Sequence, residues 1–238
     1  MNRKTLDRIK ALQDAKRAAV LVTDLEDGNQ RLVENRGVGE LDQGLRGVAE
    51  QALARDVSLI YEEGERRMFV QPFNPPLRLI VVGAVHISQP LLRIASVLGF
   101  DVTLVDPREA WTDKHRFPEG DVTLSDEWPD EALEELGLDH RSAVVVLTHD
   151  PKLDDPALQV ALRSPAFYVG ALGSKKTHRS RIRRLRNAGL EDPALARIAG
   201  PIGLPIGSKN PQEIALAIMA EVVQALRRGF EARPLPEG

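Results

Sequence analysis

The sequence predicts an α/β protein, with a Rossmann-like parallel sheet domain preceded by a small α+β N-terminal domain. Apolar strands and helix-period segments alternate through the C-terminal two thirds, which is typical of a parallel sheet covered by helices. Within this part, residues 77–106 form a strand–turn–helix–strand pattern, and the acid Asp106 follows Gly83 by 23 residues, as in a dinucleotide-binding unit. Residues 1–70 instead mix short strand patterns with helical ones.

Composition and charge exclude several classes of protein. The 238 residues are 42% hydrophobic and 28% charged, which is ordinary for a soluble globular protein. A net charge of −3 gives no drive toward nucleic acid or anionic membranes. No apolar run is long enough to span a bilayer, and the N-terminus lacks the apolar core of a signal peptide. We therefore expect a cytoplasmic protein with no nucleic-acid partner.

The absence of cysteine narrows the chemistry further. With 0 cysteines, the sequence has no disulfide, no thiolate metal ligand, no cysteine nucleophile and no residue to carry a persulfide. It also contains no cluster of metal ligands, no nucleophile elbow and no P-loop motif. We expect no metal site built from side chains.

The N-terminal domain is expected to span residues 1–74. Its predicted helices are residues 5–17 and 41–54, and its predicted strands are residues 19–23, 31–34, 57–61 and 66–70. The buried face of the second helix is expected to contain Leu41, Leu45, Val48 and Leu53. The proline-rich residues 71–76 are expected to interrupt regular structure and to separate the domains.

The Rossmann-like domain is expected to span residues 77–228. After the opening unit, the predicted strands are residues 121–124, 143–147 and 166–169, and the predicted helices are residues 129–136, 156–163, 174–188 and 211–227. Asn210 as a cap, Pro211 at the first position and Glu213 at the third mark the start of the last helix. Residues 229–238 have little pattern and are expected to form a loose tail.

The candidate site lies at the carboxyl ends of the predicted strands, where open parallel sheets bind their ligands. The first strand leads into a turn over residues 83–88, reading GAVHIS in place of the usual G-x-G-x-x-G. Gly83 and the helix that follows can cradle an anion, or Gly83 can simply form a tight turn. Val85 replaces the second glycine and should crowd a pyrophosphate, and His86 is either a ligand contact or an exposed side chain.

Two further strand ends carry polar residues. Asp106 is a candidate for binding a ribose or for capping a turn, and Arg108 can favour a phosphorylated ribose or lie on the surface. Thr148-His149-Asp150 follows a buried strand, so His149 and Asp150 are candidates for proton transfer or ligand contact. The alternative is turn chemistry at Asp150. The sequence contains no identifiable pair of nucleophile and base, so His149 and Asp150 are candidates and no catalytic residue is assigned.

A glycine-containing loop opens the basic helix. Gly170, Gly173, Ser174 and Lys175 form a pattern that suits a phosphate or another anion at a helix start. The other cations of this helix form either a solvated face or a docking surface for an acidic partner. A weaker loop of the same kind precedes the last helix and contains Gly203, Gly207, Ser208 and Lys209.

Five stretches carry a resemblance to a known family: residues 78–108, RFPEG at 116–120, 143–158, 168–178 and 200–221. In order and spacing, they resemble the XdhC/CoxI family, accessory proteins of molybdenum-containing hydroxylases. The family turn usually reads GAGH, and many members carry an N-terminal cysteine motif. This sequence has neither, and so resembles a short form of the family.

The resemblance implies a maturation chaperone rather than an enzyme. Such a protein binds the molybdenum cofactor, as molybdopterin or its dinucleotide form, supports its sulfuration by a separate cysteine desulfurase, and passes it to a xanthine dehydrogenase- or CO dehydrogenase-type apoenzyme. The cofactor-binding residues then expected are Gly83, Val85, His86, Asp106, Thr148, His149, Asp150, Gly170, Gly173, Ser174 and Lys175.

Two other functions remain open at this point. One is an NAD(P)-dependent oxidoreductase, with Asp106 on the ribose and His149 as acid or base. The other is a nucleotide-sensing module without chemistry. The closing helix and the N-terminal domain are both candidate homodimer surfaces.

Overall fold

The computed structural model describes residues 2–108, 122–232 and 234–235, and the chain divides into two compact units, Met1–Pro76 and Leu77–Gly238. The resembling stretch RFPEG at 116–120 and the first residue of the predicted strand 121–124 lie outside the described residues.

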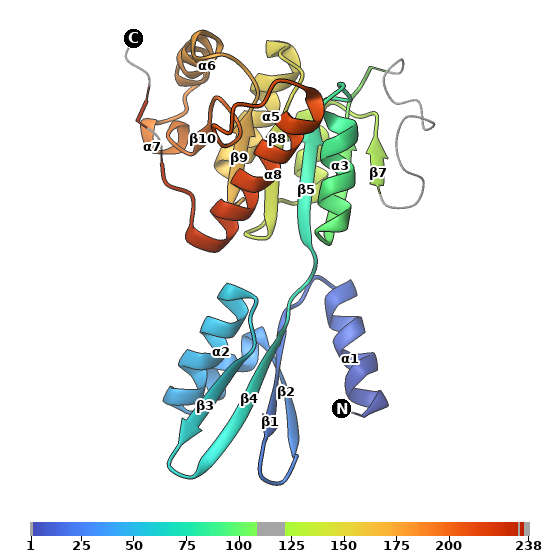
Figure 1. The fold of residues 1–238 in the computed structure, drawn as a ribbon, viewed down its shortest axis with the longest axis vertical. Helices are drawn as coiled ribbons and strands as arrows, with labels where there is room; N and C mark the ends of the chain where they lie inside the picture. Colours follow the sequence, from blue (N-terminus) through green and yellow to red (C-terminus); the bar gives the residue numbers. More distant parts are fainter. Residues whose placement is uncertain (1, 109–121, 233, 236–238) are drawn as a thin grey trace. The chain divides into compact units, whose positions relative to one another are not determined.

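The first unit is a four-stranded antiparallel sheet with helices, which confirms the predicted α+β module (Figure 1). The strand order is β2-β1-β4-β3. Its elements are α1 (Arg3–Asp14), β1 (Ala19–Asp24), β2 (Gln30–Glu34), the 3₁₀ helix η1 (Asn35–Glu40), α2 (Gln43–Arg55), β3 (Leu59–Glu63) and β4 (Arg66–Phe73).

One face of this sheet packs against η1 and α2. Alternate strand residues such as Val20, Val22 and Val70 point to this face and are buried together with residues of α2. The fully buried residues of α2 are Leu45, Ala49 and Ala52, whereas Val48 and Leu53, expected in its buried face, are only partly buried.

Strand β4 continues through Pro72 to Phe73, so the expectation that residues 71–76 lack regular structure is wrong for the first three of them. The last residue of β4 paired with β3 is Val70, whereas β1 pairs with β4 up to Phe73. Pro72 therefore lies where β4 has a neighbouring strand on one side only, the kind of position at which a missing N–H is tolerated.

The second unit contains a six-stranded parallel sheet in the order β10-β9-β8-β5-β6-β7, which confirms the Rossmann-like fold. Its strands are β5 (Leu77–Val82), β6 (Phe100–Val105), β7 (Val122–Ser125), β8 (Ser142–Val146), β9 (Tyr168–Ala171) and β10 (Ile198–Ala199). Its helices are α3 (Ser88–Val97), α4 (Pro129–Leu136), α5 (Pro151–Arg163), α6 (Lys175–Asn187), α7 (Asp192–Leu195) and α8 (Pro211–Arg228).

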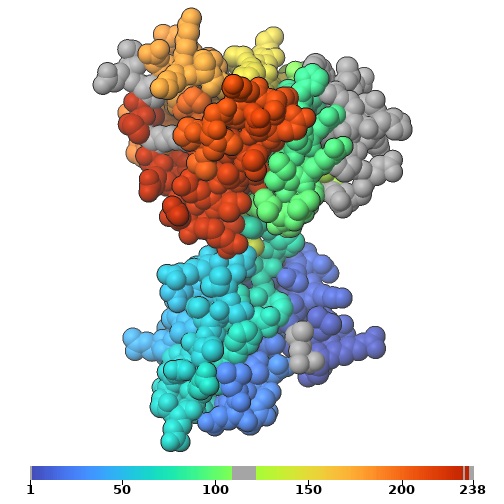
Figure 2. All heavy atoms as spheres, viewed as in Figure 1, coloured from blue at the N-terminus to red at the C-terminus, as the bar shows by residue number. Residues whose placement is uncertain are grey.

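Helices cover both faces of the parallel sheet, which explains the continuous apolar runs in its strands. Residues of α3 and α8 pack on one face, and their surfaces meet along one side of this unit (Figure 2). Residues of α4, α5, α6 and α7 pack on the other face. No helix within the described ranges is long and apolar enough to cross a membrane.

Three details refine the predicted elements. Helix α5 begins at Pro151, because Asp150 caps it, and Pro156 lies inside the helix rather than at its start. Helix α8 has the expected capping box between Asn210 and Glu213. In the segment expected to be loose, the ring of Phe230 packs edge-on against Tyr168, with centroids 6.0 Å apart.

Candidate functional site

The strand order changes direction between β5 and β8, and the candidate site is built around this point. Gly83 directly follows β5 and has φ at +109°, a conformation that favours glycine. A Cβ at Gly83 would lie 2.7 Å from Cγ2 of Thr148 and 3.2 Å from its backbone nitrogen. The ends of β5 and β8 therefore meet so closely that only glycine fits between them.

Asp106 follows β6 and is completely buried, and the protein itself occupies both of its carboxylate oxygens. Oδ1 accepts hydrogen bonds from the backbone N–H of Arg108 at 3.0 Å and its Nε at 2.8 Å. Oδ2 accepts from Nη2 of Arg108 and from the N–H of Ala84, both at 2.7 Å. Burial raises the pKa of Asp106, but these hydrogen bonds outweigh it and hold the pKa below its usual value.

The turn after β5 is closed by internal hydrogen bonds. The N–H of Gly83 donates to the Val105 carbonyl at 2.8 Å, and the N–H of Ala84 donates to Asp106. The N–H of Val85 donates to Oγ of Ser88 at 3.2 Å, and the N–H of Ser88 donates to the Val85 carbonyl at 3.0 Å. The side chain of His86 is exposed, whereas Val85 is partly buried against the core.

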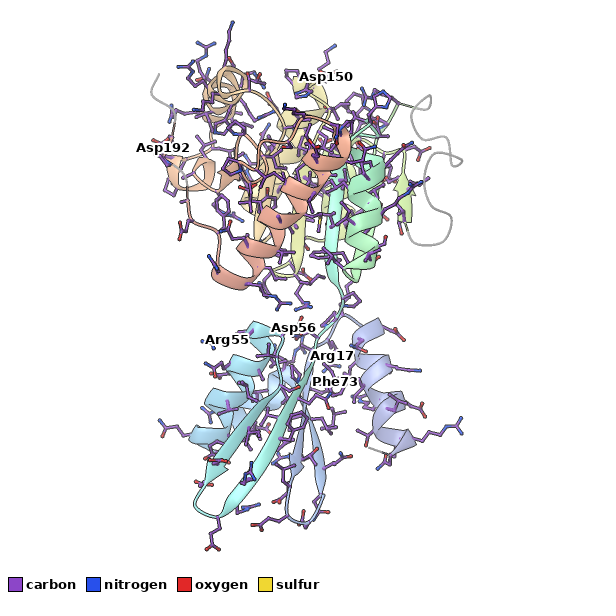
Figure 3. All side chains as sticks on the ribbon, viewed as in Figure 1. Arg17, Arg55, Asp56, Phe73, Asp150 and Asp192 are labelled. Atoms are coloured by element: carbon purple, nitrogen blue, oxygen red, sulfur yellow. The ribbon has the colours of Figure 1, made fainter. Side chains whose placement is uncertain are left out.

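The Thr148–Asp150 triplet lies between β8 and α5, and its last residue, Asp150, is labelled in Figure 3. Asp150 caps α5 by accepting a hydrogen bond from the N–H of Lys152 at 2.9 Å. His149 is exposed and has φ at +66°, an uncommon backbone conformation for a residue other than glycine. Its imidazole is therefore presented at the surface by a constrained turn.

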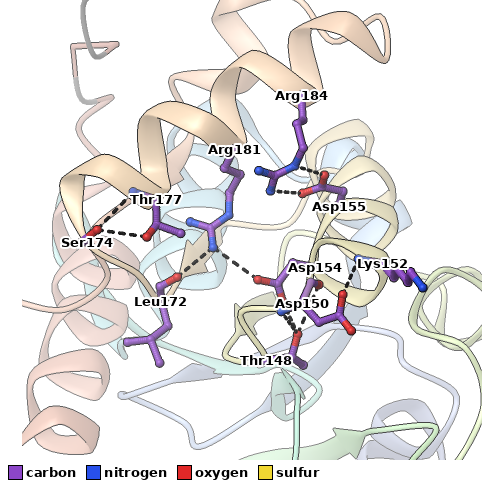
Figure 4. A network of polar contacts seen from close by, with 10 residues as sticks. All are labelled: Thr148, Asp150, Lys152, Asp154, Asp155, Leu172, Ser174, Thr177, Arg181 and Arg184. Atoms are coloured by element: carbon purple, nitrogen blue, oxygen red, sulfur yellow. Dashed lines mark hydrogen bonds and ion pairs between the residues drawn. The ribbon is translucent and has the colours of Figure 1, made fainter.

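Behind this triplet lies a buried polar network that sequence reasoning missed (Figure 4). Oγ1 of Thr148 donates to Oδ1 of Asp154 at 2.5 Å, and Oδ2 of Asp154 lies 3.3 Å from Nη2 of Arg181. That same Nη2 donates to the Leu172 carbonyl at 2.8 Å. Asp154 and Arg181 are 2% and 1% exposed, so the network ties the end of β8 to the loop after β9 beneath the protein surface.

Burial dominates the titration of this pair. It raises the pKa of Asp154, with the hydrogen bond from Thr148 and the charge of Arg181 acting in the opposite direction. It lowers the pKa of Arg181, against the attraction of Asp154. One feature of the sequence points to Asp154 as part of the site: it lies four residues after Asp150, and residues four apart lie on the same side of a helix.

The loop from β9 into α6 contains two glycines with different surroundings. Gly170 is buried within β9, and a Cβ there would lie 2.5 Å from Cδ1 of Ile202, so this glycine serves close packing. Gly173 has φ at +147°, and Ser174 caps α6 by accepting from the N–H of Thr177 at 3.1 Å. Lys175, at the first position of α6, is exposed.

The predicted residues follow strands that share one edge of the parallel sheet, and those after β5, β6 and β8 are in contact. The turn after β5 is hydrogen-bonded to Asp106 after β6, and Gly83 lies against Thr148 after β8. The hydrogen bond to Asp106 raises the pKa of Arg108 against the opposing effect of burial, and the charges of Asp106, Asp150 and Asp154 act in the same direction as that hydrogen bond.

The weaker loop before α8 is held by hydrogen bonds to that helix. The N–H of Gly203 donates to Glu221 at 2.7 Å, and that of Lys209 donates to Glu213 at 2.6 Å. Glu213 belongs to the capping box of α8, so the hydrogen bond from Lys209 forms part of the N-terminal cap of this helix.

Known proteins resemble this chain over the second unit. A family profile described as the XdhC Rossmann domain matches residues 79–222. A probable xanthine dehydrogenase subunit from Bacillus subtilis is 33% identical over 161 residues, which is 68% of this chain and 46% of that protein. The molybdenum cofactor insertion chaperone PaoD from Escherichia coli is 29% identical over 164 residues, which is 69% of this chain and 45% of that protein.

A solved structure extends the likeness. The crystal structure of a xanthine dehydrogenase from Bacillus halodurans matches with a TM-score of 0.73 and 28% identity, over 94% of this chain and 67% of that one. The chain spans less than half the length of the curated relatives above. Since the family profile covers most of the second unit, the resemblance drawn from the sequence is confirmed, and the chain belongs to the XdhC family.

Proposed function

We propose that this protein is an accessory chaperone for a molybdenum hydroxylase, which binds the molybdenum cofactor at the strand-end crevice and delivers it to the apoenzyme. The observation that carries the proposal is the placement of three polar loops, Gly83–His86, Thr148–Asp150 and Gly173–Lys175, beyond the carboxyl ends of strands in a doubly wound sheet. The names of the relatives from Bacillus subtilis and Escherichia coli support the same class of function.

The residues present fit an anionic, hydrogen-bonding cofactor. The start of α6 presents backbone N–H groups beside the exposed Lys175, and His149 presents an exposed imidazole. The cofactor supplies the molybdenum redox centre of the recipient enzyme, whereas the residues of this chain need only bind it, orient it and release it. We further propose that a separate cysteine desulfurase sulfurates the bound cofactor, because this sequence has 0 cysteines to carry a persulfide.

The geometry disfavours the NAD(P)-dependent oxidoreductase. Both oxygens of Asp106 already accept hydrogen bonds from Arg108 and Ala84, so this carboxylate has little capacity left for ribose hydroxyls. Three expectations stay predictions: a cofactor held as molybdopterin or its dinucleotide form, a homodimer, and a cytoplasmic location.

His149→Ala is expected to weaken cofactor retention about fivefold, the equivalent of one hydrogen bond, without changing stability. His140→Ala is the matched control, because His140 is also exposed but precedes β8 instead of following it. Both variants are purified from a molybdenum-replete host, and bound pterin and molybdenum are measured by absorbance and mass analysis.

The wild-type protein in that experiment tests the function itself. Bound pterin with molybdenum supports the chaperone, and a bound nicotinamide nucleotide with turnover would instead establish the oxidoreductase. A nucleotide without turnover would establish a sensing module. Equal retention by the His149 and His140 variants would remove His149 from the site.

A further inference from the structure

The turn after β5, where a Rossmann fold ordinarily receives a diphosphate, has few donors left to offer. Four of the six N–H groups from Gly83 to Ser88 donate to acceptors within the protein, at distances from 2.7 to 3.2 Å. The N–H of Ala84 is held by the carboxylate of Asp106, whose charge is in turn paired with Arg108. An anion at this turn would have to displace internal hydrogen bonds.

The turn into α6, which we define as Gly173–Lys176, differs from the turn after β5 in the availability of its backbone donors. Among the described residues, none accepts a hydrogen bond from the N–H groups of these four consecutive residues. They precede a helix of 13 residues with no acidic side chain in its first turn. Free N–H groups at a helix start attract anions, and Lys175 and Lys176 are exposed at the same place.

A buried cation beneath this turn gives independent support. Arg181 is 1% exposed, and its Nε and Nη1 have no hydrogen-bond partner within the described part of the chain. Nη1 lies 3.7 Å from the position that a Cβ on Gly173 would occupy, so the guanidinium points at the underside of the turn. Asp154 meets only Nη2, at 3.3 Å, which leaves the side of the guanidinium that faces the turn without a counter-charge among the residues that the structure describes.

We propose that the α6 turn, and not the turn after β5, binds the phosphate or diphosphate group of the ligand. The N–H groups of Gly173–Lys176 hold the anion, Lys175 contacts it from solvent, and Arg181 stabilises it through its charge from below. The inference rests on the proposed function only in taking the strand-end crevice as the binding site. It places the anionic end of the ligand beside β9, on the far side of β8 from the turn after β5.

Inorganic pyrophosphate is the probe, followed by calorimetry and by amide chemical shifts of the full chain. We expect saturable binding that shifts the amides of Gly173–Lys176 and leaves those of Ala84 and Val85 in place. Lys175→Ala should weaken binding about tenfold. Arg183→Ala removes the same charge from an exposed position further along α6 and should change affinity by less than about twofold.

Two results would overturn the inference: shifts centred on Ala84 and Val85, or equal losses in the Lys175 and Arg183 variants. The second result would mean that pyrophosphate responds only to the net charge of α6. The proposed function is tested separately, because it fails if the purified protein carries no pterin. Pyrophosphate binding at Gly173–Lys176 with no pterin retained would support the anion site and contradict the chaperone function.

Discussion

Arg181→Met is expected to lower the free energy of unfolding of the second unit by about 3–5 kcal/mol, because it leaves a buried carboxylate without its cation. Asp154 is 2% exposed and has Arg181 as its ion-pair partner at 3.3 Å. The double variant Asp154→Asn/Arg181→Met should recover much of the loss, since it removes both charges together. Urea denaturation followed by circular dichroism measures all three proteins.

Arg184→Met is the matched control for this experiment. Arg184 lies on the same helix and pairs with Asp155 at 2.6 Å, but its side chain is 37% exposed. Its loss should cost about 0–1 kcal/mol, as for other exposed ion pairs. If Arg181→Met cost no more than Arg184→Met, the buried network would not connect the ends of β8 and β9 as described.

Asp106→Asn is expected to cost about 1–3 kcal/mol at neutral pH, because it removes the charge that Arg108 and the Ala84 N–H stabilise. The folded-state pKa of Asp106 is lowered below the usual value of 3.8. Its contribution to stability is therefore present above about pH 4 and is lost as the pH falls through the folded-state pKa. The difference between wild type and variant should shrink on acidification.

Thermal or urea unfolding at about pH 7 and about pH 3, on either side of the ordinary carboxyl pKa, measures this difference. Asp101→Asn is the control, because Asp101 is an exposed carboxylate on the same strand, β6. It should change stability little under either condition. A gap between Asp106→Asn and wild type that stays as large in acid as at neutral pH would show that the carboxylate charge is not what holds the turn.

Much of the fold could be predicted because both faces of the parallel sheet are buried. That burial makes β5, β6 and β8 apolar runs that stand out in a single sequence. Short elements such as α7 and the two-residue β10 could not be predicted, since four or fewer residues carry no periodicity. The interruption predicted at Pro72 is wrong because the sequence does not show which strands pair beside β4.

The candidate site likewise contains residues that could be predicted from the sequence and residues that could not. Asp106, Thr148 and Ser174 could be predicted from local patterns, since each lies shortly after a strand or just before a helix. Asp154 and Arg181 are 27 residues apart, and only tertiary packing brings them together. The role of Asp106 differs from the expected one for a local reason: Arg108, two residues on, occupies the carboxylate that a ribose would use.

Transfer of cofactor to an apoenzyme tests the central claim most directly. The protein is loaded in a molybdenum-replete host, freed of unbound cofactor and mixed with a cofactor-free molybdenum hydroxylase, whose activity is then followed. We expect activity to appear in proportion to the pterin lost from the chaperone, and to appear less with Lys175→Ala than with Arg183→Ala. Activity that never rises while the loaded protein keeps its pterin would contradict a role in cofactor insertion.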